Sequence, residues 1–455
     1  MTDQVPNISS VLLGFHGQRD ELFNELHTRP FPLVDTPSRI SQLAVLHLGE
    51  GQGRQRDREA EFQHLCLLCA RYSVNPPTQE ATCYYQDFGG FEFRWERHTE
   101  FSTYTFVHRL ASEPFQKTAL SLLPEEWLNA LPGKVISGLH IEVEAMPQEP
   151  PAVDTLRGHF EGHRLLSSYT NDRQAQVWTA YRLHKDNMGR FLIFNDRLNP
   201  CQMGRLARRI LELETYRLMA LLSFPLARQI APNVRDMDQQ LATVIQQITD
   251  IESLDDERRL LGELTTLSAR IEQIISDTNY RFSATEAYYR LAMSRLDELR
   301  EHEVCGLQTL KEFLSRRLTP AYRTCETIRA DLDDLSKRID RASELLRTRV
   351  NLTIEDQNQH LLQSMDRRSK LQLRMQQAVE GLSVAAISYY LVGLFKYLAE
   401  SAKSLGLISN SHLLTGLFVP FAILFVMFGL ARMKKRLNIV NKKPKAENEP
   451  RKQGL

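Results

Sequence analysis

Apolar residues in the first half of the chain follow short patterns of two kinds, separated by turn signals. Short apolar runs such as ISQLAVLHL (40–48) predict strands, whereas REAEFQHLCLLCARY (58–72) places its apolar residues on one face of a helix. Residues 81–110 are rich in aromatic residues and threonine and turn at Gly89-Gly90, which predicts an antiparallel meander. Further strands are expected at residues 135–145, 164–170, 175–184 and 190–195. Residues 1–235 are therefore predicted to form an α+β domain on an antiparallel or mixed sheet.

Between residues 236 and 352 the pattern changes to the spacing of long helices. Glycine becomes rare, and apolar residues recur at alternating intervals of four and three positions. The two series are Leu260, Leu264, Leu267, Ile271 and Ile274, and Ile328, Leu332, Leu335, Ile339, Ala342 and Leu346. This spacing is typical of a coiled-coil seam and also suits an ordinary helical bundle. We expect several long helices, broken at residues 276–279 and at Pro320.

Two strongly apolar runs follow near the end of the chain. A stalk helix over 353–380 is expected to continue into the first run, GLSVAAISYYLVGLFKYL (381–398). Residues 399–412 connect this run to the second one, LLTGLFVPFAILFVMFGLA (413–431). The second run has 19 residues and no charge, close to the roughly 20 residues that cross a bilayer. Its presence and the short connection favour a two-helix transmembrane hairpin, whereas the first run taken alone also fits a buried core helix.

Five residues of the two runs are candidates for particular roles in such a hairpin. Lys396 lies close enough to the end of the first run for its ammonium group to reach the membrane interface. Tyr389, Tyr390 and Gly393 are better suited to contact with protein than with lipid. Pro420 in the second run is tolerated in a membrane helix more readily than in a soluble one.

The distribution of basic residues predicts the orientation of the hairpin. Arg367, Arg368, Lys370 and Arg374 precede the first run, nine basic residues lie in the tail 432–455, and the connection contains only Lys403. The positive-inside rule then places both flanks in the cytoplasm and the connection outside. No secretory signal is expected, because the first 26 residues lack a basic start followed by a long apolar stretch. The soluble part and both termini are therefore expected in the cytoplasm.

Composition argues against several classes of function. The 57 basic and 56 acidic residues nearly cancel, so a general nucleic-acid binder is not expected. Six scattered cysteines fit free thiols in a reducing compartment. Cys66 and Cys69 have the spacing of a metal or redox pair, but they lie on the apolar face of a predicted helix without a second pair, which favours core packing. Glycine-rich phosphate loops and nucleophile-elbow motifs are missing, and neither a cofactor nor a metal is expected.

Two small groups of charged residues suggest local interactions. His27 and Arg29 stand in a proline-rich stretch, HTRPFP, that fixes an extended path, and an imidazole and a guanidinium so close together could hold a phosphate or a carboxylate. The favoured alternative is a rigid linker in which Arg29 caps a structural carbonyl. Further along, Arg208 with Glu212, and Glu214 with Arg217, have the spacing of ordinary ion pairs on a helix.

Three segments of the sequence together resemble a known protein family. They are LHTRPFP (26–32), MGRFLIFNDRLNPCQMGRLARRILELETYRLMALLSFPLAR (188–228) and NQHLLQSMDRRSKLQLRMQQAVEGLSVAAISYYLVGL (358–394). The chain resembles a bacterial family of uncharacterised membrane-anchored proteins, with a soluble N-terminal part and C-terminal spans. The resemblance implies the inner membrane of a bacterium as the location, and it supplies neither an activity nor catalytic residues.

Three hypotheses for function follow. The leading one is a non-enzymatic scaffold in the inner membrane, which self-associates or binds a protein partner through its helical region. The alternative is a two-span ion transporter similar in architecture to the CorA-type magnesium transporters, although their Gly-Met-Asn signature is replaced here by Tyr397-Leu398-Ala399-Glu400. In that case Lys396 near the pore mouth would repel cations. The third is an enzyme whose site in the N-terminal domain uses His27 and Arg29.

Overall fold

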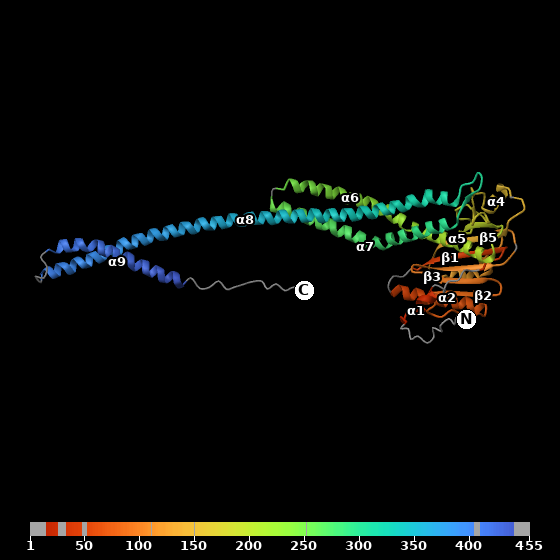
Figure 1. Cartoon of the computed structure of the whole chain (residues 1–455), viewed down its shortest axis with the longest axis horizontal. Helices are drawn as coiled ribbons and strands as arrows, with labels where there is room; N and C mark the ends of the chain where they lie inside the picture. Colours follow the sequence, from red (N-terminus) through yellow and green to blue (C-terminus); the bar gives the residue numbers. More distant parts are fainter. Residues whose placement is uncertain are drawn as a thin grey trace, which may run out of the picture. The chain divides into compact units, whose positions relative to one another are not determined.

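The computed structural model describes residues 15–25, 33–47, 52–110, 112–149, 151–251, 253–404 and 410–440. The chain forms two units, Met1–Leu345 and Leu346–Leu455. The first unit contains the sheet and most of the helices, and the second contains the later part of one long helix and the helix that follows it (Figure 1).

Nine strands in the described part of the chain form one mixed sheet, in the order β2-β3-β4-β1-β5-β8-β7-β6-β9. The strands are β1 (Ser38–Leu46), β2 (Cys83–Asp87), β3 (Glu92–Arg97), β4 (Phe101–His108), β5 (Lys134–Ala145), β6 (Leu166–Thr170), β7 (Ala175–Thr179), β8 (Gly189–Asn195) and β9 (His302–Glu303). Only the β5–β8 pair is parallel, and the other described pairs are antiparallel. The predicted mixed sheet and the meander that turns at Gly89 are confirmed.

The helices are α1 (Arg19–Glu25), α2 (Gln52–Arg71), α3 (Glu125–Asn129), α4 (Val153–His159), α5 (Pro200–Leu221), α6 (Ser223–Thr249), α7 (Leu254–Glu298), α8 (Leu310–Ser404) and α9 (Ser411–Val440). The start of α5 is fixed by its sequence. Asn199 accepts a hydrogen bond from the backbone of Gln202, Gln202 bonds back to Asn199, and Pro200 occupies the first helical position. This helix therefore begins directly after β8 and returns across the sheet.

The two faces of the sheet are covered by different helices. On one face, alternate sheet residues such as Ile40, Ile141 and Ile193 pack with apolar residues of α5, α7 and the first turns of α8. On the other face, Leu43, Phe93 and Trp95 belong to a core that includes α2 and α3. Cys69 is buried in this second core, as predicted. Figure 1 shows α2 and α5 on opposite sides of the strands.

The sheet and its core also recruit residues from beyond position 235, where the sequence pattern changes. β9 follows α7 and pairs with β6, so that Tyr169 lies opposite His302. Leu310, Leu314 and Leu318 of α8 are buried in the same core as the central strands. The first long helices are thus part of the sheet unit.

The helices α6 and α7 and the early part of α8 pack together. Arg338 of α8 lies 2.5 Å from Asp238 of α6, and Ser336 of α8 donates a hydrogen bond to Glu272 of α7. Nearly all apolar residues of the two predicted seams are buried: Leu260, Leu264, Leu267, Ile271, Ile328, Leu332, Leu335, Ile339, Ala342 and Leu346. The predicted long helices are therefore confirmed, and most of the apolar seam residues are buried by other parts of the same chain.

Both predicted helix breaks were wrong. Helix α7 continues through residues 276–279 because their polar groups are satisfied within it; Thr278, for example, is buried and donates to the carbonyl of Ile274 at 2.6 Å. Helix α8 continues through Pro320. Buried Leu318 and Ala321 on either side of the proline hold the helix in place, so tertiary packing outweighs the lost backbone hydrogen bond.

In the second unit, the end of α8 and α9 form a helical hairpin. The rings of Phe395 and Phe418 stack with their centroids 3.8 Å apart, and the small residues Ala399 and Ala422 are buried. Both helices are long and apolar enough to cross a membrane. Within the most apolar 18-residue windows, only 6% of α8 and 11% of α9 are buried, which is unlike the core helix of a soluble protein.

The five candidate hairpin residues lie on these two helices. Tyr389 and Tyr390 are 77% and 72% exposed, so they do not pack against α9 of the same chain. Gly393 is half-buried, and Pro420 is exposed on an α9 that continues through it. The Lys396 ammonium lies 4.0 Å from the carboxylate of Glu400.

We predict that Gly133→Ala destabilises the sheet unit by about 1–3 kcal/mol, because φ at Gly133 is +128° and the new Cβ would lie 2.5 Å from the carbonyl oxygen of Leu46. The control is Gly90→Ala, whose Cβ meets no atom within 4 Å. The three tryptophans of the chain are buried in the sheet unit, so their fluorescence during thermal unfolding measures the effect. Equal unfolding temperatures for the two variants would contradict the prediction.

Candidate functional site

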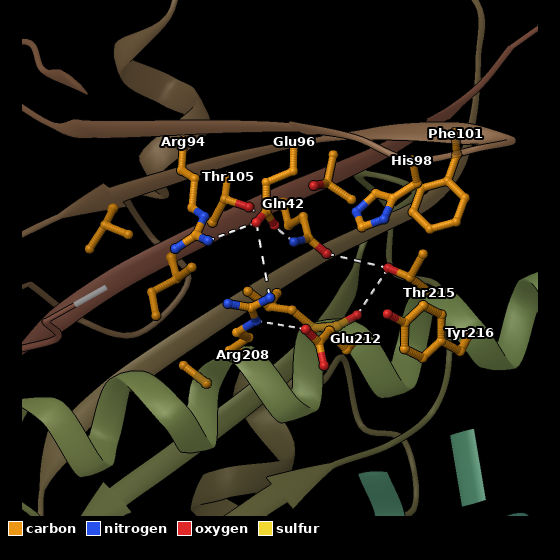
Figure 2. Close-up of a pocket in the computed structure, with 15 residues that line it drawn as sticks. Gln42, Arg94, Glu96, His98, Phe101, Thr105, Arg208, Glu212, Thr215 and Tyr216 are labelled. Atoms are coloured by element: carbon orange, nitrogen blue, oxygen red, sulfur yellow. Dashed lines mark hydrogen bonds and ion pairs between the residues drawn. The ribbon is translucent and has the colours of Figure 1, made fainter. Parts of the chain in front are cut away.

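A cavity between the sheet and α5 collects the charged and polar side chains of the first face. Figure 2 shows Gln42 of β1, Arg94 and Glu96 of β3 and Thr105 of β4 facing α5. Arg208, Glu212, Thr215 and Tyr216 of α5 lie opposite them. The cavity has a volume of about 40 Å³, which is enough for a few water molecules and too small for a metabolite.

The charges in this cavity form a chain of ion pairs that links three elements. Arg94 donates to Glu96 at 2.7 Å, and the guanidinium of Arg208 lies 4.0 Å from the same carboxylate. Arg208 also donates to Glu212 at 2.6 Å, and the other oxygen of Glu212 accepts a hydrogen bond from Arg295 of α7. Glu212 therefore connects the layer on the sheet to the next helix.

Two charged groups of this cavity, Glu96 and Arg208, have pKa values shifted in the direction that favours their charged forms. Burial alone would raise the pKa of Glu96, but Arg94 and Arg208 outweigh it and hold the pKa below its ordinary value. Burial would lower the pKa of Arg208, but Glu212 and Glu96 raise it. With these shifts in pKa, Glu96 and Arg208 both stay charged near neutral pH. The arrangement thus suits stabilisation of the fold better than acid–base catalysis.

Sequence reasoning found only the local part of this network. The ion pair of Arg208 with Glu212 is confirmed, and Glu214 likewise accepts a hydrogen bond from Arg217 at 2.9 Å. Glu96 and Arg295 were missed because they join the network from distant parts of the chain. One signal was available: Arg94 and Glu96 share one face of a strand and alternate with the aromatic residues Phe93 and Trp95.

An open cleft of about 480 Å³ adjoins the cavity and shares with it His98, Phe101 and Tyr216. The buried carboxylate of Glu61, on α2, lines this cleft. Glu61 accepts hydrogen bonds from Trp95 at 2.9 Å, Arg97 at 2.8 Å and Tyr104 at 3.2 Å. His47 also lines the cleft, and burial lowers its pKa despite the opposing effect of Glu61. The cleft has the size of a small-molecule site, but its central carboxylate is already occupied by three donors.

On the opposite face, Ser41, His140 and Asp186 lie in the order of a hydrolase triad. Ser41 Oγ is 2.7 Å from His140 Nδ1, and His140 Nε2 is 3.9 Å from Asp186 Oδ2. Burial lowers the pKa of His140 to about 4, and Ser41 is fully buried in the middle of β1. A substrate carbonyl cannot reach this serine. The contacts among Ser41, His140 and Asp186 therefore stabilise the sheet and do not form a catalytic site.

The residues proposed from sequence for an anion site cannot be compared with these groups. His27 and Arg29 lie outside the described residues. In the described part of the chain, no group of three or more His, Cys, Asp and Glu side chains has the geometry to hold a metal ion.

One family model matches nearly the whole chain. The family model described as "Protein of unknown function (DUF3422)" matches residues 15–437. The chain belongs to this family. No curated protein and no solved structure matches this chain. Because the family match spans the sheet, the long helices and both apolar helices, these parts belong together in one architecture whose biochemical role is not assigned.

We predict that Glu212→Gln lowers the free energy of unfolding of the sheet unit by about 1.5–3 kcal/mol, because two charge-assisted hydrogen bonds lose their acceptor charge. Glu263→Gln is the control. Glu263 pairs with Arg259 at 2.7 Å, but the two side chains are 44% and 51% exposed, so its loss should cost less than about 0.5 kcal/mol. Chemical unfolding followed by tryptophan fluorescence measures both. The prediction is wrong if the two variants lose equal stability.

Proposed function

We propose that this protein is a membrane-anchored scaffold, held in the bilayer by the hairpin of α8 and α9, with its sheet unit on the cytoplasmic side. One observation carries the proposal: the two helices of the hairpin expose large apolar side chains around most of their surface. The most exposed are Leu382, Leu394, Leu398, Leu413, Leu417, Phe421, Leu424, Phe425 and Phe428, each between 64% and 75% exposed.

Such a surface requires a cover. Soluble proteins rarely expose contiguous apolar patches of more than a few hundred Å². Burial of apolar area is favourable by roughly 25 cal/mol per Å², so the hairpin is strongly driven out of water. The length and charge-free character of residues 413–431 match a bilayer, and the single Lys396 of residues 381–398 lies near the end of its run.

Charge supports the proposed orientation. Basic residues precede the first apolar run and follow the second, whereas the connection carries only Lys403. The positive-inside rule then assigns the sheet unit and both termini to the cytoplasm. Together with the family resemblance, this favours the bacterial inner membrane and makes lipid the first partner of the protein.

The topology is tested with Asn410→Cys in spheroplasts treated with a membrane-impermeant maleimide. The native Cys305 is exposed in the sheet unit and serves as the cytoplasmic reference. We expect labelling of the variant but not of the wild type, and labelling of both after permeabilisation. Recovery of the protein in the soluble fraction would refute the anchor. Labelling of wild-type protein in intact spheroplasts would refute the orientation.

The stalk segment, residues 353–380, is the surface that we propose for self-association. The earlier helical seams are buried within the chain, but this part of α8 exposes its apolar residues. Ile354, Leu361, Met365, Met375 and Val379 are between 45% and 65% exposed and fall on the a and d positions of one heptad register. Arg368 and Gln372 occupy the two core positions between Met365 and Met375. Asn358 takes a further core position, where asparagine specifies register. The occupant that fits such a face is a second copy of this segment.

Membrane insertion constrains this association to be parallel, because two copies with the same topology enter the bilayer in the same direction. Equivalent core residues then face each other across the dimer axis. We expect that Leu361→Cys gives disulfide-linked dimers in membranes under mild oxidation, more than the wild type does. Gln363→Cys, two residues along at an outward position, should give few. Equal dimer yields from the two variants would rule out this interface.

No observation on the described residues favours the ion-transporter alternative. Tyr397-Leu398-Ala399-Glu400 stands in place of the Gly-Met-Asn signature, and Lys396 is 55% exposed beside Glu400. The enzyme alternative relied on His27 and Arg29, outside the described residues. The scaffold proposal rests on surfaces that the structure does describe.

A further inference from the structure

A second cleft in the sheet unit is lined almost entirely by basic, aromatic and apolar residues. It has a volume of about 560 Å³ and lies among the strands β6 and β7, helix α5 and the first turns of α8. Arg164, Arg182, Arg217, Arg317 and His163 line it, and none of its lining residues is acidic. This volume lies in the range of small-molecule sites, and the lining favours an anion.

Most of this positive charge is not compensated. Arg217 is paired with Glu214. Arg164, Arg182 and Arg317, by contrast, form no ion pair with any residue that the structure describes. Other arginines of the same unit, such as Arg94, Arg97 and Arg208, are paired with carboxylates. The side chains of Arg164, Arg182 and Arg317 are exposed, so their guanidinium groups are open to a ligand that enters the cleft.

An aromatic stack fixes two of the guanidinium groups. The rings of Tyr181 and Phe313 are parallel, with centroids 5.3 Å apart and planes inclined by 3°. Arg217 lies over Tyr181 at 5.6 Å, and Arg317 lies over Phe313 at 5.1 Å. Cation–π contact and stacking restrict the guanidinium groups before any ligand binds, which lowers the entropy lost on binding.

Tyr181 carries two further unusual features. Its backbone φ is +45°, a left-handed conformation that is rare for a bulky residue and tends to occur at functional sites. Its hydroxyl is buried and has no hydrogen-bond partner among the described residues. Buried hydroxyl groups are normally paired, so an unpaired one in a residue that lines a basic cleft is unusual.

We infer that this cleft binds a small phosphate-bearing molecule through Arg164, Arg182 and Arg317, with the Tyr181 hydroxyl as an additional donor. Guanidinium groups bind phosphate oxygens in pairs of charge-assisted hydrogen bonds. A phosphate group has more acceptor oxygens than a carboxylate, so it can bind three arginines at once. The inference is independent of the membrane anchor, because every residue that it uses lies in the sheet unit.

The test uses the full chain in detergent and inorganic pyrophosphate as the probe, titrated calorimetrically at constant ionic strength. We expect saturable binding that Arg182→Ala and Arg317→Ala each weaken by about tenfold, the effect of losing one charge-assisted interaction. Arg323→Ala is the matched control: Arg323 is exposed on the same helix as Arg317 and does not line the cleft. Absence of binding to all the phosphate probes, or an equal loss in the Arg323 variant, would overturn the inference.

Tyr181→Phe separates binding from structure, since it keeps the ring stack and removes only the hydroxyl. We expect the unliganded variant to unfold at the same or a higher temperature than the wild type, because no hydrogen bond is lost, and to bind pyrophosphate several-fold more weakly. Unchanged affinity would remove Tyr181 from the site. A lower unfolding temperature without ligand would show that the hydroxyl has a structural partner and would likewise overturn its role.

Two sources could supply such a phosphate, a soluble metabolite or a lipid headgroup. Dihexanoyl phosphatidic acid below its micelle concentration represents the lipid, and dihexanoyl phosphatidylcholine is its zwitterionic control. Tighter binding of phosphatidic acid than of pyrophosphate would assign the cleft to a lipid headgroup, and the reverse order to a soluble phosphate. Whichever of the two ligands binds more tightly, the result supports the inference only if Arg182→Ala weakens the binding of that ligand.

Discussion

The sheet unit depends on the pairing of Glu212, a half-buried carboxylate on α5. Its two oxygens accept hydrogen bonds from Arg208 on the same helix and from Arg295 on α7, while Arg208 also approaches Glu96 on the sheet. A charge in this layer is stable only when its partners are in place, so sheet, α5 and α7 must come together as a set. The position of α7 in turn allows β9 to pair with β6 and brings the start of α8 into the core.

The sheet unit contains arginines of two kinds, those paired with carboxylates and those without a described acidic partner. In the cavity under α5, the arginines Arg94 and Arg208 have carboxylate partners, and the remaining volume holds only water-sized molecules. In the basic cleft, Arg164 and Arg182 have no described acidic partner, and the volume is more than ten times larger. Compensated charge explains stability, whereas uncompensated charge around an open volume is typical of a ligand site. This contrast favours the basic cleft as the place of the proposed binding function, which requires no catalytic residue.

The apolar hairpin of α8 and α9 and the sheet unit both lie within the family match. Family membership covers residues 15–437, so both parts are inherited together. The proposed anchor would confine the sheet unit to a surface, and confinement would raise the effective concentration of a second copy or of a membrane-bound ligand. A scaffold that self-associates through the stalk segment and binds a phosphate group in each copy would use both consequences.

Much of the fold was predictable because it is encoded locally. Short apolar runs bounded by turn signals identified β1, β5 and β8, and three- and four-residue spacing identified the long helices. The ion pair of Arg208 with Glu212 followed from helical spacing alone. Local signals also misled: the polar residues 276–279 and Pro320 suggest helix ends, but packing on both sides overrides them.

By itself, the sequence determined the types of element, the two apolar runs and the charge asymmetry around them, because each depends on neighbouring residues. Only the tertiary structure decided the strand order, the addition of β9 and the burial of the helical seams within one chain. It alone assembled the basic cleft, since Arg164, Arg182 and Arg317 come from distant segments. Chain folding brings such residues together through long-range contacts, and a pattern of neighbouring residues carries no record of those contacts.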